Sequence, residues 1–97
     1  AIEEMLAADT IQPGIPYVYF NLGNLYCLSS KFVDSGDSYT KAINVYPYMG
    51  DAYYNRGLVL IYLKDKEKGC IDLSRAGELG VGDAYSVISK YCEEEKK

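Results

Sequence analysis

The chain has 97 residues, a net charge of −4, eleven tyrosines, and neither histidine nor tryptophan. Its length suits one small domain, and 48% hydrophobic with 25% charged residues is typical of a globular protein. Without histidine there is no Ser-His or Cys-His catalytic pair and no histidine-containing zinc site. A pI near 4.7 argues against nucleic acid as a partner. No apolar run approaches the roughly 18 residues of a membrane span.

The three cysteines are Cys27, Cys70 and Cys92, an odd number with no CxxC pair. Such a pattern is neither a disulfide framework nor a metal motif, so we expect reduced cysteines and neither metal nor cofactor. Cys70 is expected to be buried as a small hydrophobe, and Cys92 is the better candidate for reactivity. The compartment does not follow from the sequence, although we favour the cytoplasm.

The sequence aligns with itself, without a gap, when it is shifted by 34 residues. Bulky positions match bulky ones and small positions match small ones. The matched pairs are Tyr19 and Tyr53, Phe20 and Tyr54, Asn21 and Asn55, Gly23 and Gly57, Ser35 and Gly69, Tyr39 and Leu73, and Ala42 and Ala76. Each copy contains two apolar stretches with helical spacing, separated by a short polar turn and closed by a helix breaker. Each copy is therefore predicted to form an antiparallel helical hairpin.

Small residues recur where the two helices of a hairpin would cross. They are Gly23, Ser35 and Ala42, and then Gly57, Gly69 and Ala76. Because glycine inside a helix costs about 1 kcal/mol relative to alanine, these positions predict a close approach of two backbones. Asp51 and Asp83 are expected to be helix N-caps. The mixed charges of residues 64–68 are expected to form a solvated loop.

The 34-residue unit resembles the tetratricopeptide repeat (TPR). The segment from Tyr19 to Tyr26 is close to that family's consensus, as is Ala42 followed five residues later by Pro47. The second copy departs from it at Arg56, where leucine is expected, and at Val81, where proline is expected. The resemblance covers nearly the whole chain. It implies an all-α fold of antiparallel helix-turn-helix repeats, stacked as a short right-handed superhelix of about six helices.

The family register divides the chain into four parts. Residues 1–15 are the second helix of a partial repeat, 16–49 and 50–83 are complete repeats, and 84–97 form a capping helix. In the capping helix, Ala84, Val87, Ile88 and Tyr91 share the face expected to pack. The start of the sequence lacks methionine and is too acidic for a signal peptide, so we expect a mature protein or a piece of a longer chain.

The resemblance implies a protein–protein interaction module rather than an enzyme. Members of the family bind an extended peptide or a helix in a concave groove lined by the first helix of each repeat. By register, the lining residues are Tyr17, Phe20, Asn21, Asn24, Leu28, Asp51, Tyr54, Asn55, Leu58, Tyr62, Tyr85 and Ser89. Other tyrosines are expected to pack, namely Tyr19, Tyr26, Tyr39, Tyr53 and Tyr91. The alternative, that tyrosine is only filler throughout, stays open.

Asn24 and Asn55 match two asparagines with which chaperone-binding members of the family hold a terminal carboxylate. Those members also use three basic residues, and Phe20, Tyr85 and Ser89 stand at these positions here. Without cations the charge-assisted hydrogen bonds are missing, so we do not expect a carboxylate clamp. The two amides can still bond a ligand's backbone. Alternatively, they are consensus residues that tolerate solvent.

Two further functions stay open. The incomplete first repeat could dock on a second copy, which would make the chain a homo-oligomerisation segment. The chain could also position an enzyme domain encoded elsewhere in a longer protein.

Overall fold

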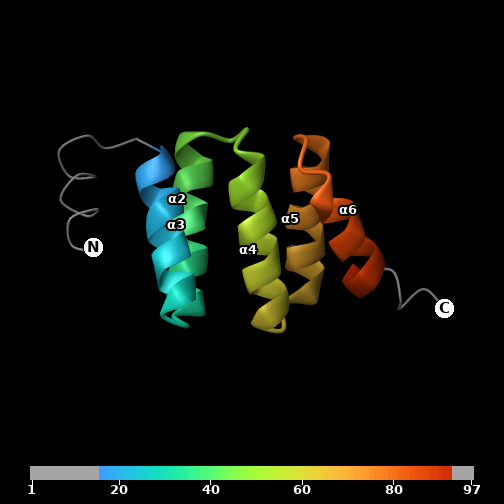
Figure 1. Cartoon of the computed structure of the whole chain (residues 1–97), viewed down its shortest axis with the longest axis horizontal. Coiled ribbons are helices and arrows are strands. Elements are labelled where there is room, and N and C mark those ends of the chain that lie inside the picture. The colour runs from blue at the N-terminus through green and yellow to red at the C-terminus, as the bar shows by residue number, and fades with distance from the viewer. Residues whose placement is uncertain (1–15, 93–97) are drawn as a thin grey trace.

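A computed structural model describes residues 16–92, whose regular structure is entirely helical. The elements are α2 (Pro16–Leu28), α3 (Phe32–Val45), α4 (Gly50–Tyr62), α5 (Lys66–Glu78), α6 (Asp83–Val87) and the π-helical turn η1 (Ile88–Cys92). They stand side by side in chain order (Figure 1). Helix α2 packs on α3, α4 packs on α5, and α3 and α4 join the two hairpins. The predicted all-α repeat fold is thus confirmed. The helix expected at 1–15 and the end of the tail, 93–97, lie outside the described residues.

The same turn closes both hairpins at positions 34 residues apart. Ser30 and Lys64 have left-handed backbones, with φ of 62° and 73°. The next amide donates back across each turn, Lys31 N to Tyr26 O and Asp65 N to Leu60 O, both at 2.8 Å. Such a closure satisfies carbonyls at the end of a helix that would otherwise lack a donor. Gly80, with φ of 107°, follows α5 in the same way. The sequence period is therefore repeated in the backbone geometry.

The backbones of α4 and α5 touch where glycines face each other. A Cβ on Gly57 would lie 2.9 Å from the carbonyl oxygen of Gly69, and one on Gly69 would lie 2.8 Å from that of Gly57. The predicted tight crossing is confirmed here. In the first hairpin, the Ser35 hydroxyl donates to the Gly23 carbonyl at 2.8 Å, and the ring of Tyr39 fills the space beside Gly23.

Two buried clusters form the core, one on each side of Tyr53. The first comprises Ala42, Ile43, Met49 and Ala52. The second comprises Leu73, Ala76 and Ala84. Tyr53 packs against both clusters and carries the guanidinium groups of Arg56 and Arg75 within 5.6 and 6.0 Å of its ring centre. The first cluster joins the two hairpins, because it includes Ala42 and Ile43 of α3 and Ala52 of α4, and Tyr53 links it to the second cluster.

Arg56, the departure from the expected leucine, forms a bidentate ion pair. Its Nε and Nη2 donate to the Asp72 carboxylate at 2.7 and 2.9 Å, and its Nη1 donates to the Thr40 hydroxyl at 3.1 Å. The hydrogen bond to Asp72 raises the pKa of Arg56 above its ordinary value, against the opposing effect of burial. A polar network linking α3, α4 and α5 thus stands where an apolar contact was expected.

Two local expectations were wrong. The cap residues of α4 and α6 are Met49 and Gly82, so Asp51 is the second residue of α4 and Asp83 the first residue of α6, and neither is the N-cap. At these positions the negative charges of the two aspartates still interact favourably with the positive N-terminal end of the helix dipole. Residues 66–68 are not a loop but the first turn of α5, because the Asp65 carboxylate caps that helix by accepting from Lys68 N at 3.4 Å.

The C-terminal segment differs from the predicted capping helix because α6 widens into η1. In a π-helix the backbone hydrogen bonds run between i and i+5, so each turn is wider than in an α-helix. Val87, Ile88 and Cys92 pack against the second cluster, whereas Tyr91 is 39% exposed. The expectation that Tyr91 packs was therefore wrong.

Cys70 of α5 and Cys92 of η1 form a disulfide, with Cα atoms 6.0 Å apart. The expectation of reduced cysteines was wrong for this pair. A separation of 22 residues and an odd cysteine count carry no disulfide signal, and tertiary packing of the C-terminal segment on α5 brings the two together. Cys27 is the free cysteine of the described chain.

No helix in the stretch 16–92 combines the length and apolarity that a membrane crossing would need.

Candidate protein-binding groove

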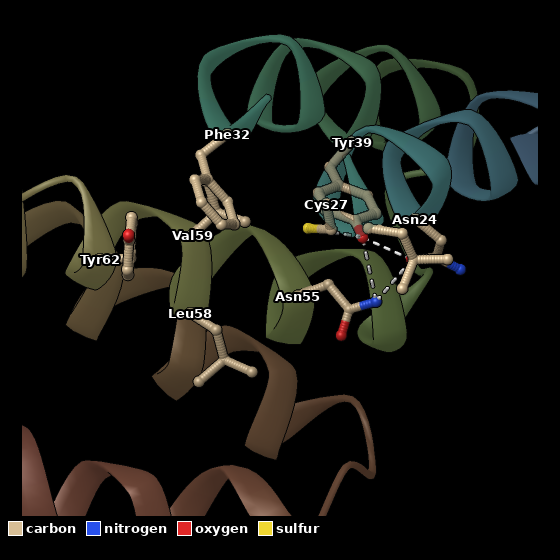
Figure 2. Close-up of a pocket in the computed structure, with 9 residues that line it drawn as sticks. Asn24, Cys27, Phe32, Tyr39, Asn55, Leu58, Val59 and Tyr62 are labelled. Carbon is tan, nitrogen blue, oxygen red and sulfur yellow. Dashed lines mark hydrogen bonds between the residues drawn. The ribbon is translucent and has the colours of Figure 1, made fainter. Parts of the chain in front are cut away.

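A pocket of about 490 Å³ opens between the first hairpin and α4 (Figure 2). Its lining residues are Asn24, Cys27 and Leu28 of α2, Phe32 and Tyr39 of α3, and Asn55, Leu58, Val59 and Tyr62 of α4. The α4 residues follow the spacing i, i+3, i+4, i+7 and so form one stripe of that helix. The groove is therefore built where the first helices of two successive hairpins face each other, with a wall supplied by α3.

One end of the pocket is aromatic. The rings of Phe32 and Tyr62 have centroids 4.3 Å apart and lie at 43° to each other, which closes the gap between α3 and α4 (Figure 2). At the mouth, Leu28 is 84% and Tyr62 is 64% exposed. Large apolar side chains that gather at an open pocket provide area that a ligand can bury.

The other end is polar and is organised around the buried Tyr39. The Tyr39 hydroxyl donates to Asn24 Oδ1, and Asn55 Nδ2 donates to the same oxygen at 3.1 Å and to the Tyr39 hydroxyl at 3.4 Å. Burial, and then the hydrogen bond with Cys27, raise the pKa of Tyr39 well above its ordinary value. The phenol therefore stays protonated around neutral pH and keeps donating to Asn24.

In each asparagine amide, one polar group makes no hydrogen bond within the described residues. Asn24 Nδ2 and Asn55 Oδ1 make no hydrogen bond to any of residues 16–92, and both point away from the Tyr39 hydroxyl in Figure 2. One amide group offers a donor and the other an acceptor, the complement of a peptide unit's C=O and N–H. The Tyr39 hydroxyl fixes the orientation of both amides through its bonds with Asn24 Oδ1 and Asn55 Nδ2.

Several residues predicted for the groove lie in this pocket. They are Asn24, Leu28, Asn55, Leu58 and Tyr62.

The other predicted residues lie elsewhere. Tyr17 and Asp51 line a separate hollow together with Tyr46 and Tyr48. Phe20 packs on the first cluster and Tyr54 on the second. The ring of Tyr85 covers Gly77 of α5, where an added Cβ would lie 2.6 Å from it. Asn21 and Ser89 are exposed and line neither hollow.

Sequence reasoning missed Cys27, Phe32, Tyr39 and Val59 as lining residues. It drew the lining from register positions on the first helix of each repeat, whereas Phe32 and Tyr39 come from α3. An aromatic residue directly after the polar turn, at Phe32, was the available signal. Within residues 16–92, no group of three or more cysteine, aspartate or glutamate side chains could hold a metal ion.

Comparison of the chain with protein-family models and with curated proteins found no match. Among solved structures, it is similar to the crystal structure of MamA, a TPR-type protein, with a TM-score of 0.90 and 22% sequence identity. The match covers 98% of this chain and 57% of MamA, so the chain spans little more than half the length of that protein. At this identity the similarity establishes the fold, a TPR-like solenoid of helical hairpins.

Proposed function

We propose that this chain is a protein-interaction module that binds an extended peptide segment in the pocket between α2 and α4. One observation carries the proposal, namely an apolar cavity with exposed Leu28 and Tyr62 at its mouth, beside an unused donor on Asn24 and an unused acceptor on Asn55. The TPR-like fold supports it.

The apolar end of the pocket binds a ligand side chain, and the polar end binds the ligand backbone. An apolar side chain of the ligand enters against Phe32, Val59 and Tyr62, and burying a side chain of leucine size contributes about 1.5–3 kcal/mol. Asn24 Nδ2 donates to a ligand carbonyl, and Asn55 Oδ1 accepts from a ligand N–H. Each such bond adds about 1 kcal/mol. The amides meet the ligand without reorganising, since Tyr39 already orients them.

The ligand does not place a C-terminal carboxylate in the pocket. The pocket lining contains no lysine or arginine, so a terminal carboxylate would be desolvated there without a cation. The proposal therefore does not include a carboxylate-clamp mode.

The test is selection of binders from a displayed library of random linear peptides, followed by affinity measurements on one selected peptide. Leu58→Glu puts a charge into the pocket, and Asn55→Ala removes the unused acceptor. We expect Leu58→Glu to raise the Kd tenfold or more, and Asn55→Ala to raise it about fivefold. Val33→Glu is the matched control, because Val33 is exposed on α3 outside the pocket lining, and we expect it to bind like the wild type. Circular dichroism checks that all three variants stay folded.

Equal affinity of the wild type, Leu58→Glu and Asn55→Ala would exclude the groove as the binding site. Tyr54→Ala is a poorer probe, because Tyr54 packs against the second core cluster and its loss affects folding as well.

Self-association through residues 1–15 stays a prediction, because those residues lie outside the described part of the chain. Sedimentation equilibrium separates this alternative from the groove proposal, and a strictly monomeric chain would remove it.

A further inference from the structure

We propose that the Cys70–Cys92 disulfide is a thiol-exchange site, which a dithiol reductant opens from solvent and which controls attachment of the C-terminal cap. The cap is defined as α6 together with η1, residues 83–92. The site lies on α5 and the cap, away from the groove, so this inference goes beyond the proposed function and does not depend on it.

Both cysteines are accessible from one open hollow. Cys70 and Cys92 line a depression of about 560 Å³ at the start of α5, with Lys64, Asp65, Lys66 and Glu67 as its other lining residues. Exchange requires a thiolate to reach a disulfide sulfur, and a depression of this size admits a small dithiol. Among the described lining residues, the two lysines and two acids balance in formal charge.

The noncovalent attachment of the cap is small. The α-helical part has five residues and η1 has five, far fewer than an isolated helix needs for stability in water. Ala84 is the buried residue of the cap, Val87 and Ile88 are partly buried against the second cluster, and Tyr91 is exposed. The disulfide is therefore a principal restraint on the cap, and it closes a loop with a sequence separation of 22.

The exchange conserves atoms and electrons. A thiolate of the reductant attacks one cysteine sulfur, forms a mixed disulfide and expels the other cysteine as a thiolate, which takes a proton from water. The second thiol of the reductant, as its thiolate, then attacks the mixed disulfide and releases the first cysteine. The dithiol is oxidised to a disulfide, and Cys70 and Cys92 are reduced to two thiols.

Release of the cap would uncover part of α5. Val87 and Ile88 pack against the cluster formed around Leu73 on the side of α5. Without the bond, the cap is held by these contacts, by the buried Ala84 and by the ring of Tyr85 on Gly77. In the described residues the cap keeps this apolar side of α5 from water, so the oxidised form is covered there and the reduced form opens more readily.

The experiment uses the full chain, oxidised and then treated with dithiothreitol without denaturant. Alkylation followed by mass spectrometry counts the thiols, hydrogen exchange reports on residues 83–92, and thermal unfolding gives Tm. We expect Cys70 and Cys92 to become alkylated under these native conditions. Amide exchange in 83–92 should rise tenfold or more while that of α2 and α3 is unchanged, and Tm should fall by roughly 10–20 °C, as expected for opening a loop of this length.

The control is the double variant Cys70→Ser with Cys92→Ser, which keeps the free Cys27. It should behave like the reduced chain with or without dithiothreitol. The proposal is overturned if the native disulfide resists reduction until the protein is denatured. It is equally overturned if reduction leaves the exchange of residues 83–92 unchanged.

Discussion

Tyr39 serves packing and the candidate site at once. Its ring is 1% exposed and fills the space beside Gly23, while its hydroxyl bonds Asn24 and Asn55 across the two hairpins. The sequence predicted the packing role from the bulky match of Tyr39 with Leu73. It could not predict the hydroxyl's contacts, because leucine at the matched position has no polar atom and the repeat pattern therefore carries no information about it.

The raised pKa of Tyr39 predicts a stability that depends on pH. The folded chain holds the phenolic proton more tightly than the unfolded chain, so this stabilisation is complete below the ordinary pKa of 10.0. It is lost as the pH rises above that value, by up to about 1.4 kcal/mol per pH unit for one proton. Urea unfolding at pH 9 and pH 11 should show the decline in the wild type and a smaller one in Tyr39→Phe. Tyr17→Phe, at an exposed tyrosine, should decline like the wild type, and an equal decline in all three chains would contradict this account.

For pairs of packed helices, small residues in the sequence predicted the contact better than large residues did. Gly57 and Gly69 predicted the α4–α5 crossing because glycine inside a helix needs a packing reason. The α6–η1 junction was unpredictable for the opposite reason, since apolar residues with ordinary helical spacing continue through it. Cys92 packs against the second cluster while Tyr91 is 39% exposed, and the disulfide joins Cys92 to α5.

The crossing predicts opposite effects for two glycine-to-alanine substitutions. In Gly69→Ala the new Cβ meets the Gly57 carbonyl oxygen and the Ile61 side chain, both at 2.8 Å. Forcing it in should destabilise the chain by about 1–3 kcal/mol or more. In Gly36→Ala the Cβ meets only Val59, at 3.8 Å, so the better helix propensity should stabilise α3 by up to about 1 kcal/mol. Chemical denaturation measures both, and equal effects of the two substitutions would refute the assignment of close contact.

For the whole molecule, the repeat period predicted the number and order of the described helices, and the structure confirms the all-α solenoid. The coupling between its units was not predictable. It depends on Tyr53, which packs against both core clusters, and on Arg56, where an apolar residue was expected and a guanidinium joins three helices instead. Side-chain partners of this kind depend on which helices face each other, and a period alone does not contain that information.

Because each hairpin contacts mainly its neighbours, stability in such an array is a sum of unit and interface contributions. Tyr53→Ala weakens the contact that both clusters share. We expect a loss of roughly 2–4 kcal/mol and a shallower urea transition, with the amides of α2–α3 and α4–α5 no longer protected to the same degree. Tyr48→Ala, at an exposed tyrosine, is the control and should keep the wild-type transition. A single steep transition in Tyr53→Ala would mean that the interface does not depend on this ring.

The disulfide also limits how far the chain can lengthen under load. Cys70 and Cys92 are 22 positions apart in sequence but only 6.0 Å apart between Cα atoms. When the two ends are pulled, tension passes through the sulfur–sulfur bond and bypasses the segment between them. About 75 Å of contour length, at roughly 3.4 Å per residue, is thereby withheld from extension. The segment between Cys70 and Cys92 can therefore be extended only after the disulfide has been reduced.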